Sequence, residues 1–208
     1  MRVSKEKAAE NRQDILTAAA RLFREQGISA TGVDAIPTEA RLTYGAVYSQ
    51  FGSKEAIATE AIRLAMQGSR HLWQRLVERN GTKKVFPAIV AAYLSREHCD
   101  APGQGCVVAA LGSEIARQPP SVREAFTKEL KDALAFLAEL MPEDTPSRQY
   151  EDAIAVFAGM VGALILARAV NDETLSKRIL HATAERITRQ PEVRTPARRA
   201  KRTRSSFI

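Results

Sequence analysis

Small and hydroxyl-bearing side chains gather on residues 43–50 of this chain. Gly45 and Ala46 leave little bulk there, and Thr43 and Ser49 carry hydroxyl groups. Hydroxyls hydrogen-bond to phosphate oxygens, and a small side chain lets the backbone approach another molecule closely. A catalytic segment would more often hold a cluster of titratable side chains, which this one lacks. The chemistry that it predicts is recognition of a nucleic acid.

Helix boundaries follow from apolar periodicity and from capping residues. Gly27 ends the first helix in the left-handed conformation that glycine favours. Thr31, Thr43 and Ser53 are typical N-caps of the next three helices. The predicted helices cover residues 5–26, 32–40, 44–50, 54–79, 83–98, 106–117, 120–141, 147–170 and 173–189. Because no strand-like alternation persists, we expect an all-α fold of about nine helices.

The second and third predicted helices have the spacing of a helix-turn-helix, whose second helix enters the major groove of DNA. Base-edge contacts would fall mainly to Tyr44, Ala46 and Ser49, and Lys54 would neutralise a phosphate. The residues expected to form the internal seam are Val33, Ile36, Ala40, Val47 and Phe51. The residues expected to contact DNA are Thr31, Arg41, Thr43, Tyr44, Gly45, Ala46, Tyr48, Ser49 and Lys54.

Over residues 9–69 the chain resembles the tetracycline-repressor-like (TetR) family of transcriptional regulators. The resemblance rests on Ile15–Phe23, Gly27, Thr31, Ile36, Ala40, Gly45–Tyr48, Phe51 and Ser53–Glu55. It implies a homodimer that binds a palindromic operator in double-stranded DNA and is released by a small molecule. It also implies an N-terminal DNA-binding domain over residues 1–54 and a regulatory and dimerisation bundle over 55–190. Independently of the resemblance, the Arg/Pro/Ser/Thr-rich composition of residues 191–208 predicts a basic, disordered tail.

Two positions depart from the family pattern. Pro37 stands where a helix former is usual, and inside a helix it should cost about 3 kcal/mol. Arg41 replaces a usual glycine, so it must adopt an unfavourable turn conformation, although its charge could reach a phosphate. Both departures bear on operator affinity more than on the fold.

A second informative segment, Gly103–Glu114, carries the cysteine best placed to react. Cys106 follows two glycines at a predicted helix start, where unpaired amides and the helix dipole favour a thiolate. Arg168 is the candidate cation beside it. The Gly103–Glu114 segment resembles the corresponding segment of a sub-group of the same family, in which some members sense electrophiles or oxidants with this cysteine. Because free cysteine is often simply buried, a sensor and a core residue both remain open for Cys106. Cys99 is expected to be an exposed bystander or, at best, a resolving partner for Cys106.

Apolar and aromatic residues of the larger domain could line a ligand pocket between helices, although ordinary core packing explains each of them equally well. The candidates are Met66, Trp73, Phe86, Tyr93, Cys106, Phe136, Tyr150, Phe157 and Met160. Small residues on the helix over 147–170 let another helix approach, so this helix and the one over 173–189 are the dimer candidates. The alternative is that they pack within one subunit.

Composition limits the classes of protein to which this chain could belong. The chain has 208 residues, 45% of them hydrophobic, and a formal charge of +7 that is concentrated in six basic residues between Arg194 and Arg204. That tail could contact phosphates or simply aid solubility. The longest uncharged apolar run, residues 153–167, is too short to cross a bilayer and suggests a buried helix. With only two cysteines and no secretory signal, we expect a cytoplasmic protein without membrane association.

An enzyme is not expected. The sequence lacks a phosphate-binding Gly-Lys-Ser/Thr loop, a His-Glu-x-x-His motif, paired-cysteine zinc spacing and a dinucleotide fingerprint. We therefore predict no metal and no cofactor. Two alternatives stay open: a thiol oxidoreductase or peroxidase that uses Cys106, and a helical interaction protein in which Pro37 and Arg41 mark a decayed DNA-binding motif.

Overall fold

The structure, a computed structural model, describes residues 5–141 and 146–189, and these contain ten α-helices, one 3-10 helix and no strand. The all-α prediction is confirmed. In chain order the elements are α1 (Lys5–Gln26), α2 (Ala35–Glu39), α3 (Tyr44–Phe51), α4 (Lys54–Asn80), α5 (Thr82–Tyr93), α6 (Arg96–Asp100), η1 (Pro102–Gln104), α7 (Val107–Ile115), α8 (Pro120–Glu139), α9 (Pro146–Ala169) and α10 (Glu173–Thr188). The basic segment between Arg194 and Arg204 lies outside the described residues.

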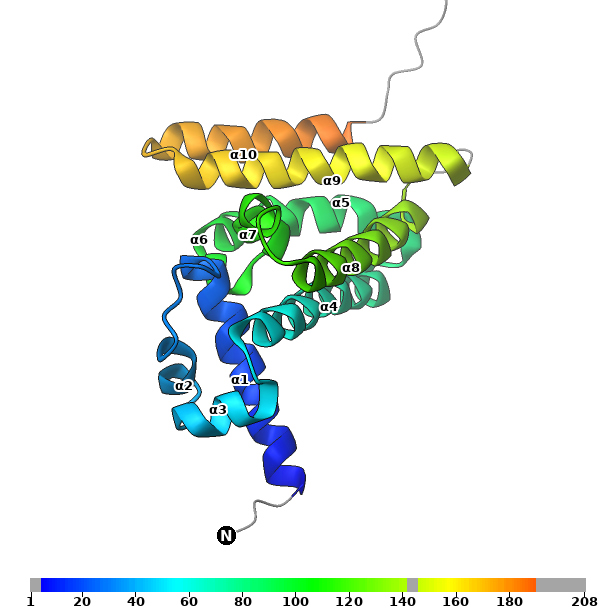
Figure 1. Cartoon of the computed structure of the whole chain (residues 1–208). Helices are drawn as coiled ribbons and strands as arrows, with labels where there is room; N and C mark the ends of the chain where they lie inside the picture. The colour runs from blue at the N-terminus through cyan, green and yellow to red at the C-terminus, as the bar shows by residue number, and fades with distance from the viewer. Residues whose placement is uncertain (1–4, 142–145, 190–208) are drawn as a thin grey trace, which may run out of the picture.

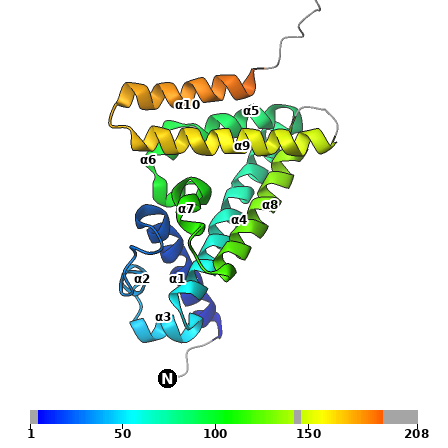
Figure 2. The ribbon, with the colours of Figure 1, turned by 45° about the horizontal axis from the view of Figure 1, so that its top comes forward.

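The helices form three tiers (Figures 1 and 2). The short helices α2 and α3 lie at one end beside α1. In the middle α4 and α8 run side by side, and at the far end α9 and α10 form a hairpin that lies over α5. The helix predicted over residues 83–98 is divided, because Ser95 accepts a hydrogen bond from the His98 amide and begins a new helix, α6. This break accounts for the tenth helix.

Two hydrophobic cores hold the tiers together. The first core is built on Phe23, Ile36, Val47 and Ile57, and it also receives Leu111 from α7. It therefore crosses the domain boundary proposed after residue 54, so the small domain is packed directly on the larger one. The second core fills the space between α5, α8, α9 and α10.

Polar contacts between helices supplement these cores. Arg12 of α1 donates to both carboxylate oxygens of Glu60 on α4, at 2.5 and 2.6 Å, and its guanidinium lies 4.3 Å above the Phe51 ring. Farther along α4, Arg70 donates to the buried carboxylate of Glu129 on α8 at 2.5 Å. A buried carboxylate requires such partners because desolvation penalises its charge.

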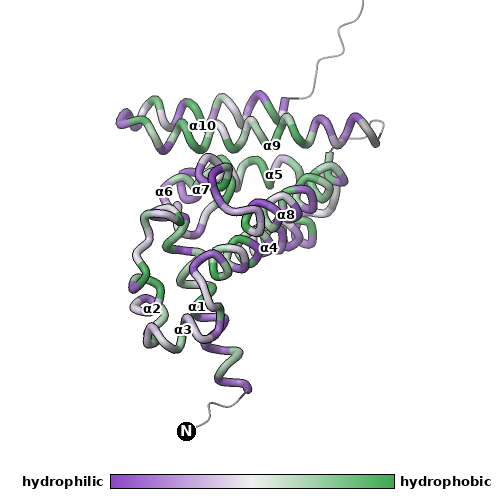
Figure 3. The backbone as a smooth tube through the Cα atoms, viewed as in Figure 1, coloured by the Kyte–Doolittle hydropathy of each residue, from purple (hydrophilic) through white to green (hydrophobic). Residues whose placement is uncertain are grey.

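One face of α9 is packed and the other is exposed. By length and composition alone, its Arg148–Ala169 span is long and apolar enough to cross a membrane. Only 33% of an apolar 18-residue stretch within that span is buried in the protein. Phe157, Met160 and Leu164 enter the second core, whereas Leu166 is 56% exposed. The hydropathy view shows apolar residues along much of this helix (Figure 3). The prediction of a buried helix is thus correct for one side only.

Candidate nucleic-acid interface and ligand pocket

The turn between α2 and α3 fixes how α3 is presented. Thr43 caps α3 by accepting a hydrogen bond from the Ala46 amide at 3.2 Å, as predicted, and Ser53 caps α4 in the same way. Arg41 has φ 56°, the left-handed conformation that its glycine-like position requires. The Arg41 side chain is exposed, and Arg41 precedes the Thr43 cap of α3 by two residues.

The outer surface of α3 carries most of the predicted contact residues. Thr43, Tyr44, Gly45 and Ser49 are exposed, and Ala46 is half-buried. Tyr44 is 50% exposed and stacks on the ring of Tyr48 at a centroid distance of 4.3 Å. A stacked pair is stiffer than two separate side chains, so it presents a fixed surface.

Tyr48 packs partly inside the domain. It is half-buried against the first core, and its hydroxyl donates to the Val33 carbonyl at 3.4 Å. Burial raises the pKa of the Tyr48 hydroxyl, so it remains a neutral donor. The hydroxyl of Tyr48 already has a partner within the protein. A contact between Tyr48 and DNA therefore stays a prediction.

Gly45 is open on its outer side. A Cβ built on it would meet no described atom within 4 Å, and its φ is not in the left-handed region. Glycine inside a helix is normally unfavourable relative to alanine. Nothing in the packing of the described residues requires glycine here, so the open side is available to a closely approaching ligand.

Three predictions about this module need correction. Thr31 is only 1% exposed, and its hydroxyl donates to the Gly27 carbonyl at 2.6 Å, so it is neither an N-cap nor placed to contact DNA. The N-cap residue of α2 is instead Asp34, whose side chain makes no capping bond. Val33 is 51% exposed and does not belong to the internal seam.

The ammonium of Lys54 donates a hydrogen bond to the Thr31 carbonyl at 2.5 Å. Lys54 is partly exposed, so it stabilises the loop between α1 and α2 and also faces solvent.

Pro37 destabilises its helix less than predicted. Because α2 begins at Ala35, Pro37 lies in its first turn, where backbone amides lack intrahelical partners in any case. Its own carbonyl accepts a bond from the Leu42 amide at 2.9 Å and helps to close the turn. The departure is therefore compatible with a formed helix-turn-helix.

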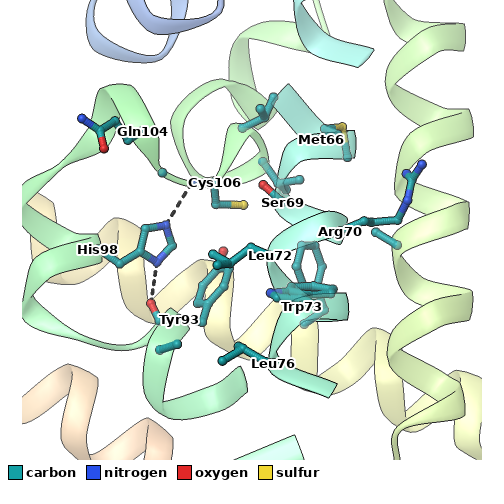
Figure 4. Close-up of a pocket in the computed structure, with 16 residues that line it drawn as sticks. Met66, Ser69, Arg70, Leu72, Trp73, Leu76, Tyr93, His98, Gln104 and Cys106 are labelled. Atoms are coloured by element: carbon teal, nitrogen blue, oxygen red, sulfur yellow. Dashed lines mark hydrogen bonds between the residues drawn. The ribbon is translucent and has the colours of Figure 1, made fainter. Parts of the chain in front are cut away.

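A pocket of about 160 Å³ lies between α4, α5 and the chain around Cys106 (Figure 4). Met66, Trp73, Tyr93, Cys106 and Phe157 line it, as predicted. The other four candidates do not: Phe86 and Met160 are buried in the second core, and Phe136 and Tyr150 pack against that core. The lining residues that sequence reasoning missed are Ser69, Arg70, Leu72, Leu76, Ala92, His98, Gln104, Gly105, Val107, Val108 and Ala133.

His98 connects two walls of this pocket. Its Nε2 accepts a hydrogen bond from the Cys106 amide at 3.0 Å, and its Nδ1 lies 2.6 Å from the Tyr93 carbonyl. An amide can only donate, so Nε2 must be unprotonated and Nδ1 must carry the proton. Burial is the main cause that lowers the pKa of His98 below its usual value, and the positive charge of Arg168 adds to this effect. The hydrogen bond to the Tyr93 carbonyl raises the pKa but does not offset the other two effects.

We expect His98 to make folding stability depend on pH. The unfolded chain takes up a proton near the ordinary histidine pKa of about 6.5. The folded protein does so only at lower pH, so stability should be full above about 6.5 and fall as the pH drops toward the folded pKa. Unfolding temperatures at about pH 7.5 and about pH 5.5 should show a smaller acid-induced drop in His98→Asn than in the unchanged protein. Equal drops would mean that other groups cause it.

Cys106 is the N-cap residue of α7, at the predicted helix start, and both cysteines are unpaired and buried. The prediction that Cys99 is exposed was therefore wrong. Arg168 donates to the carbonyls of Cys99 and His98, at 2.9 and 2.7 Å, rather than to the thiol of Cys106. Its guanidinium lies against Gly105, so Arg168 supports the backbone on which Cys106 stands.

Two contacts join the pocket walls to the small domain. Arg24 at the end of α1 donates to the Gly103 carbonyl, and Gly103 packs so closely against Glu25 that a Cβ would collide with its carboxylate. At the other end of α7, Glu114 accepts from the amides of Ile28 and Ser29, at 2.9 and 2.6 Å. Partial burial opposes the charge on Glu114, but these bonds outweigh it, so the pKa of Glu114 lies below its ordinary value.

Metal chemistry finds no support in the described ranges, because the His, Cys, Asp and Glu side chains of residues 5–141 and 146–189 form no group of three that could hold an ion.

Known proteins share both the module and the fold. Residues 15–61 match the family of bacterial regulatory proteins called the tetR family. The transcriptional regulator LmrA of Bacillus subtilis is 26% identical over 169 residues, which cover 79% of this chain and 90% of LmrA. The regulator AcrR of Shigella flexneri is 41% identical over 64 residues, or 31% of this chain and 30% of AcrR.

A solved structure of a TetR-family regulator from Agrobacterium tumefaciens has a TM-score of 0.72 with 20% identity, and the match covers 88% of this chain and 100% of that one. This likeness shows a shared fold. The similar proteins are transcriptional regulators and not enzymes, so the thiol oxidoreductase alternative loses its basis.

Proposed function

We propose that this chain is a cytoplasmic TetR-family repressor which binds a palindromic DNA operator as a homodimer and is released by a small molecule; the tetR-family match over residues 15–61 and the similarity to LmrA support the proposal. The observation that carries the proposal is the exposed surface of α3, with Gly45 open in its first turn. Hydroxyl groups there can donate to phosphates while the backbone approaches the groove. The domain division after residue 54 belongs to the same proposal.

Binding to the intergenic DNA upstream of the chain's own gene tests this proposal. We expect affinity at least about 10³-fold above that for a scrambled duplex, as specific regulators commonly show. The logarithm of the binding constant should fall linearly with the logarithm of salt concentration, because phosphate contacts release counterions. Fluorescence anisotropy measures both quantities. Equal affinity for both duplexes would favour the interaction protein without sequence-selective DNA binding.

The exposed face of α9 supports dimerisation through α9 and α10. Ile154, Ile165 and Leu166 of α9 and Leu175 of α10 are large apolar side chains left exposed in the single chain. The small residues Ala155, Ala158 and Gly159 lie among them, and a Cβ at Gly159 would meet no described atom within 4 Å. A second copy related by a two-fold axis would cover this surface and set the separation of two α3 helices.

Coupling between pocket and DNA would run through α7. Its first turn lines the pocket at Val107 and Val108, and Glu114 near its other end holds the loop that precedes α2. A helix transmits displacement along its axis because backbone hydrogen bonds link its successive turns, and seven residues span about 10 Å. A ligand that shifts α7 would therefore move the loop and, with it, the orientation of α3.

Glu114→Gln should loosen this connection. The amide can accept at only one atom and is uncharged, so the hydrogen bonds to Ile28 and Ser29 are weakened. We expect the free energy of unfolding to fall by about 1–2 kcal/mol. Amide exchange at residues 28 and 29 should accelerate at least about tenfold, which corresponds to about 1.4 kcal/mol. Hydrogen-exchange mass spectrometry measures it, with the exposed Glu124→Gln as a matched control; unchanged exchange would show that Glu114 does not hold the loop.

Modification of Cys106 is a second proposed trigger, which its position in the pocket wall and at the N-terminus of α7 supports. Iodoacetamide should add a group to the thiol, with loss of iodide, and lower operator affinity at least about tenfold by displacing α7. Cys106→Ser should remove this effect, whereas Cys99→Ser should retain it. Release that persists in Cys106→Ser would exclude this thiol from the mechanism.

A further inference from the structure

The Tyr93 hydroxyl is a buried polar group without a partner. Tyr93 is only 6% exposed, and its oxygen lies close to the Cys106 side chain but makes no well-aligned hydrogen bond to any residue that the structure describes. Figure 4 shows the ring pointing from α5 into the pocket, toward the side on which Cys106 lies. Buried hydroxyls usually have a partner, so an unpaired one that faces a cavity indicates where a ligand would bind.

This hydroxyl is available as a donor. Burial, and after it the nearby Cys106, raise the pKa of Tyr93 well above its ordinary value, so the group stays protonated at neutral pH. The Tyr93 ring is fixed by edge-to-face contacts with His98 and Phe157, at centroid distances of 4.8 and 6.1 Å. The direction of the hydroxyl is therefore set before a ligand arrives.

The charged side chains around the pocket already have hydrogen-bond partners within the protein. Arg70 is neutralised by Glu129 and points from α4 away from the cavity (Figure 4). Arg168 donates to two backbone carbonyls, and the lowered pKa of His98 keeps that ring neutral at neutral pH. A charged ligand would lose its hydration and find no oppositely charged side chain that still has a free hydrogen-bonding site among the described lining residues, so an uncharged one is favoured.

The remaining surface is apolar and of limited size. Leu72, Trp73 and Leu76 form one wall, and Phe157 contributes another aromatic surface. A cavity of about 160 Å³ is comparable to the apolar cavity of about 150 Å³ that accommodates benzene in another protein. The space therefore suits a single ring with a small substituent.

We propose that this pocket takes an uncharged, single-ring molecule with one acceptor oxygen, such as an aryl ketone, which the Tyr93 hydroxyl binds by donating a hydrogen bond. The ligand class rests on the proposed function, in which this pocket is the effector site. Tyr93 thus discriminates between an acceptor-bearing ring and a hydrocarbon of equal shape.

Two isosteric probes test this proposal on the full chain. Acetophenone carries a carbonyl oxygen, and α-methylstyrene has a CH₂ group in its place. In the unchanged protein we expect acetophenone to bind about tenfold more tightly than α-methylstyrene, the effect of one hydrogen bond. In Tyr93→Phe the two should bind about equally. That variant loses only an unpaired hydroxyl, so it should fold, and its retained binding of α-methylstyrene verifies this.

Isothermal titration calorimetry without DNA measures the four affinities, and benzoate serves as the charged probe. A preference for acetophenone that survives in Tyr93→Phe would overturn the role of Tyr93. Failure of both neutral probes to bind, or benzoate binding as tightly as acetophenone, would overturn the ligand class. DNA release is measured separately: binding that depends on Tyr93 without any release would contradict the effector function and leave the pocket chemistry standing.

Discussion

Gly45→Glu is expected to weaken specific DNA binding by at least about 100-fold while leaving the unfolding temperature nearly unchanged. A Cβ at this position would meet no described atom within 4 Å, so the fold has room for a side chain that points outward. On the exposed surface of α3 it would place a carboxylate against phosphates. Like charges brought together at an interface cost several kcal/mol, and a 100-fold loss corresponds to about 2.7 kcal/mol. Anisotropy titrations and thermal unfolding measure the two effects.

Gly68→Glu is the matched control. Gly68 lies on an exposed part of α4, and a Cβ there also meets no described atom within 4 Å. The same change of charge and size at this position should reduce operator affinity by less than about threefold. If both variants bind as weakly as each other, the loss comes from net charge and not from α3. If neither loses affinity, α3 does not enter the groove.

Leu166→Glu is expected to convert the dimer into monomers and lower operator affinity by about 10²–10⁴-fold, the range over which bivalent attachment exceeds a single contact. Leu166 is 56% exposed in the single chain, so glutamate should not disturb the second core. Across a two-fold axis the change would bury two unpaired charges. Light scattering measures the mass, and Leu166→Ala, which adds no charge, should weaken the dimer far less. A Leu166→Glu variant that remains dimeric would place the interface elsewhere.

Local signals in the sequence predict most of the fold. Gly27, Thr43 and Ser53 end or begin helices where they were expected to, because capping depends on bonds within a few residues. Thr31 shows the limit of this reasoning. Its hydroxyl bonds back to the Gly27 carbonyl, so α2 starts later than the cap pattern indicates, and the cost assigned to Pro37 falls accordingly.

The pocket could be predicted only in part. Helical periodicity shows which residues are buried, but it does not separate the face that lines a cavity from the face that enters a core. Phe86 and Met160 are buried as expected, yet they pack in the second core. His98 was missed because its partners, the Tyr93 carbonyl and the Cys106 amide, are brought together by the α6–η1 turn, which no local pattern describes.

Hydroxyl-radical footprinting of a high-affinity genomic fragment tests the central claim, that two copies of α3 read DNA side by side. We expect two protected half-sites about one helical turn apart, roughly 34–36 Å between centres, and related by two-fold symmetry. Gly45→Glu should abolish both at once. A single protected site, or protection of the same fragment that persists in Gly45→Glu, would contradict the account.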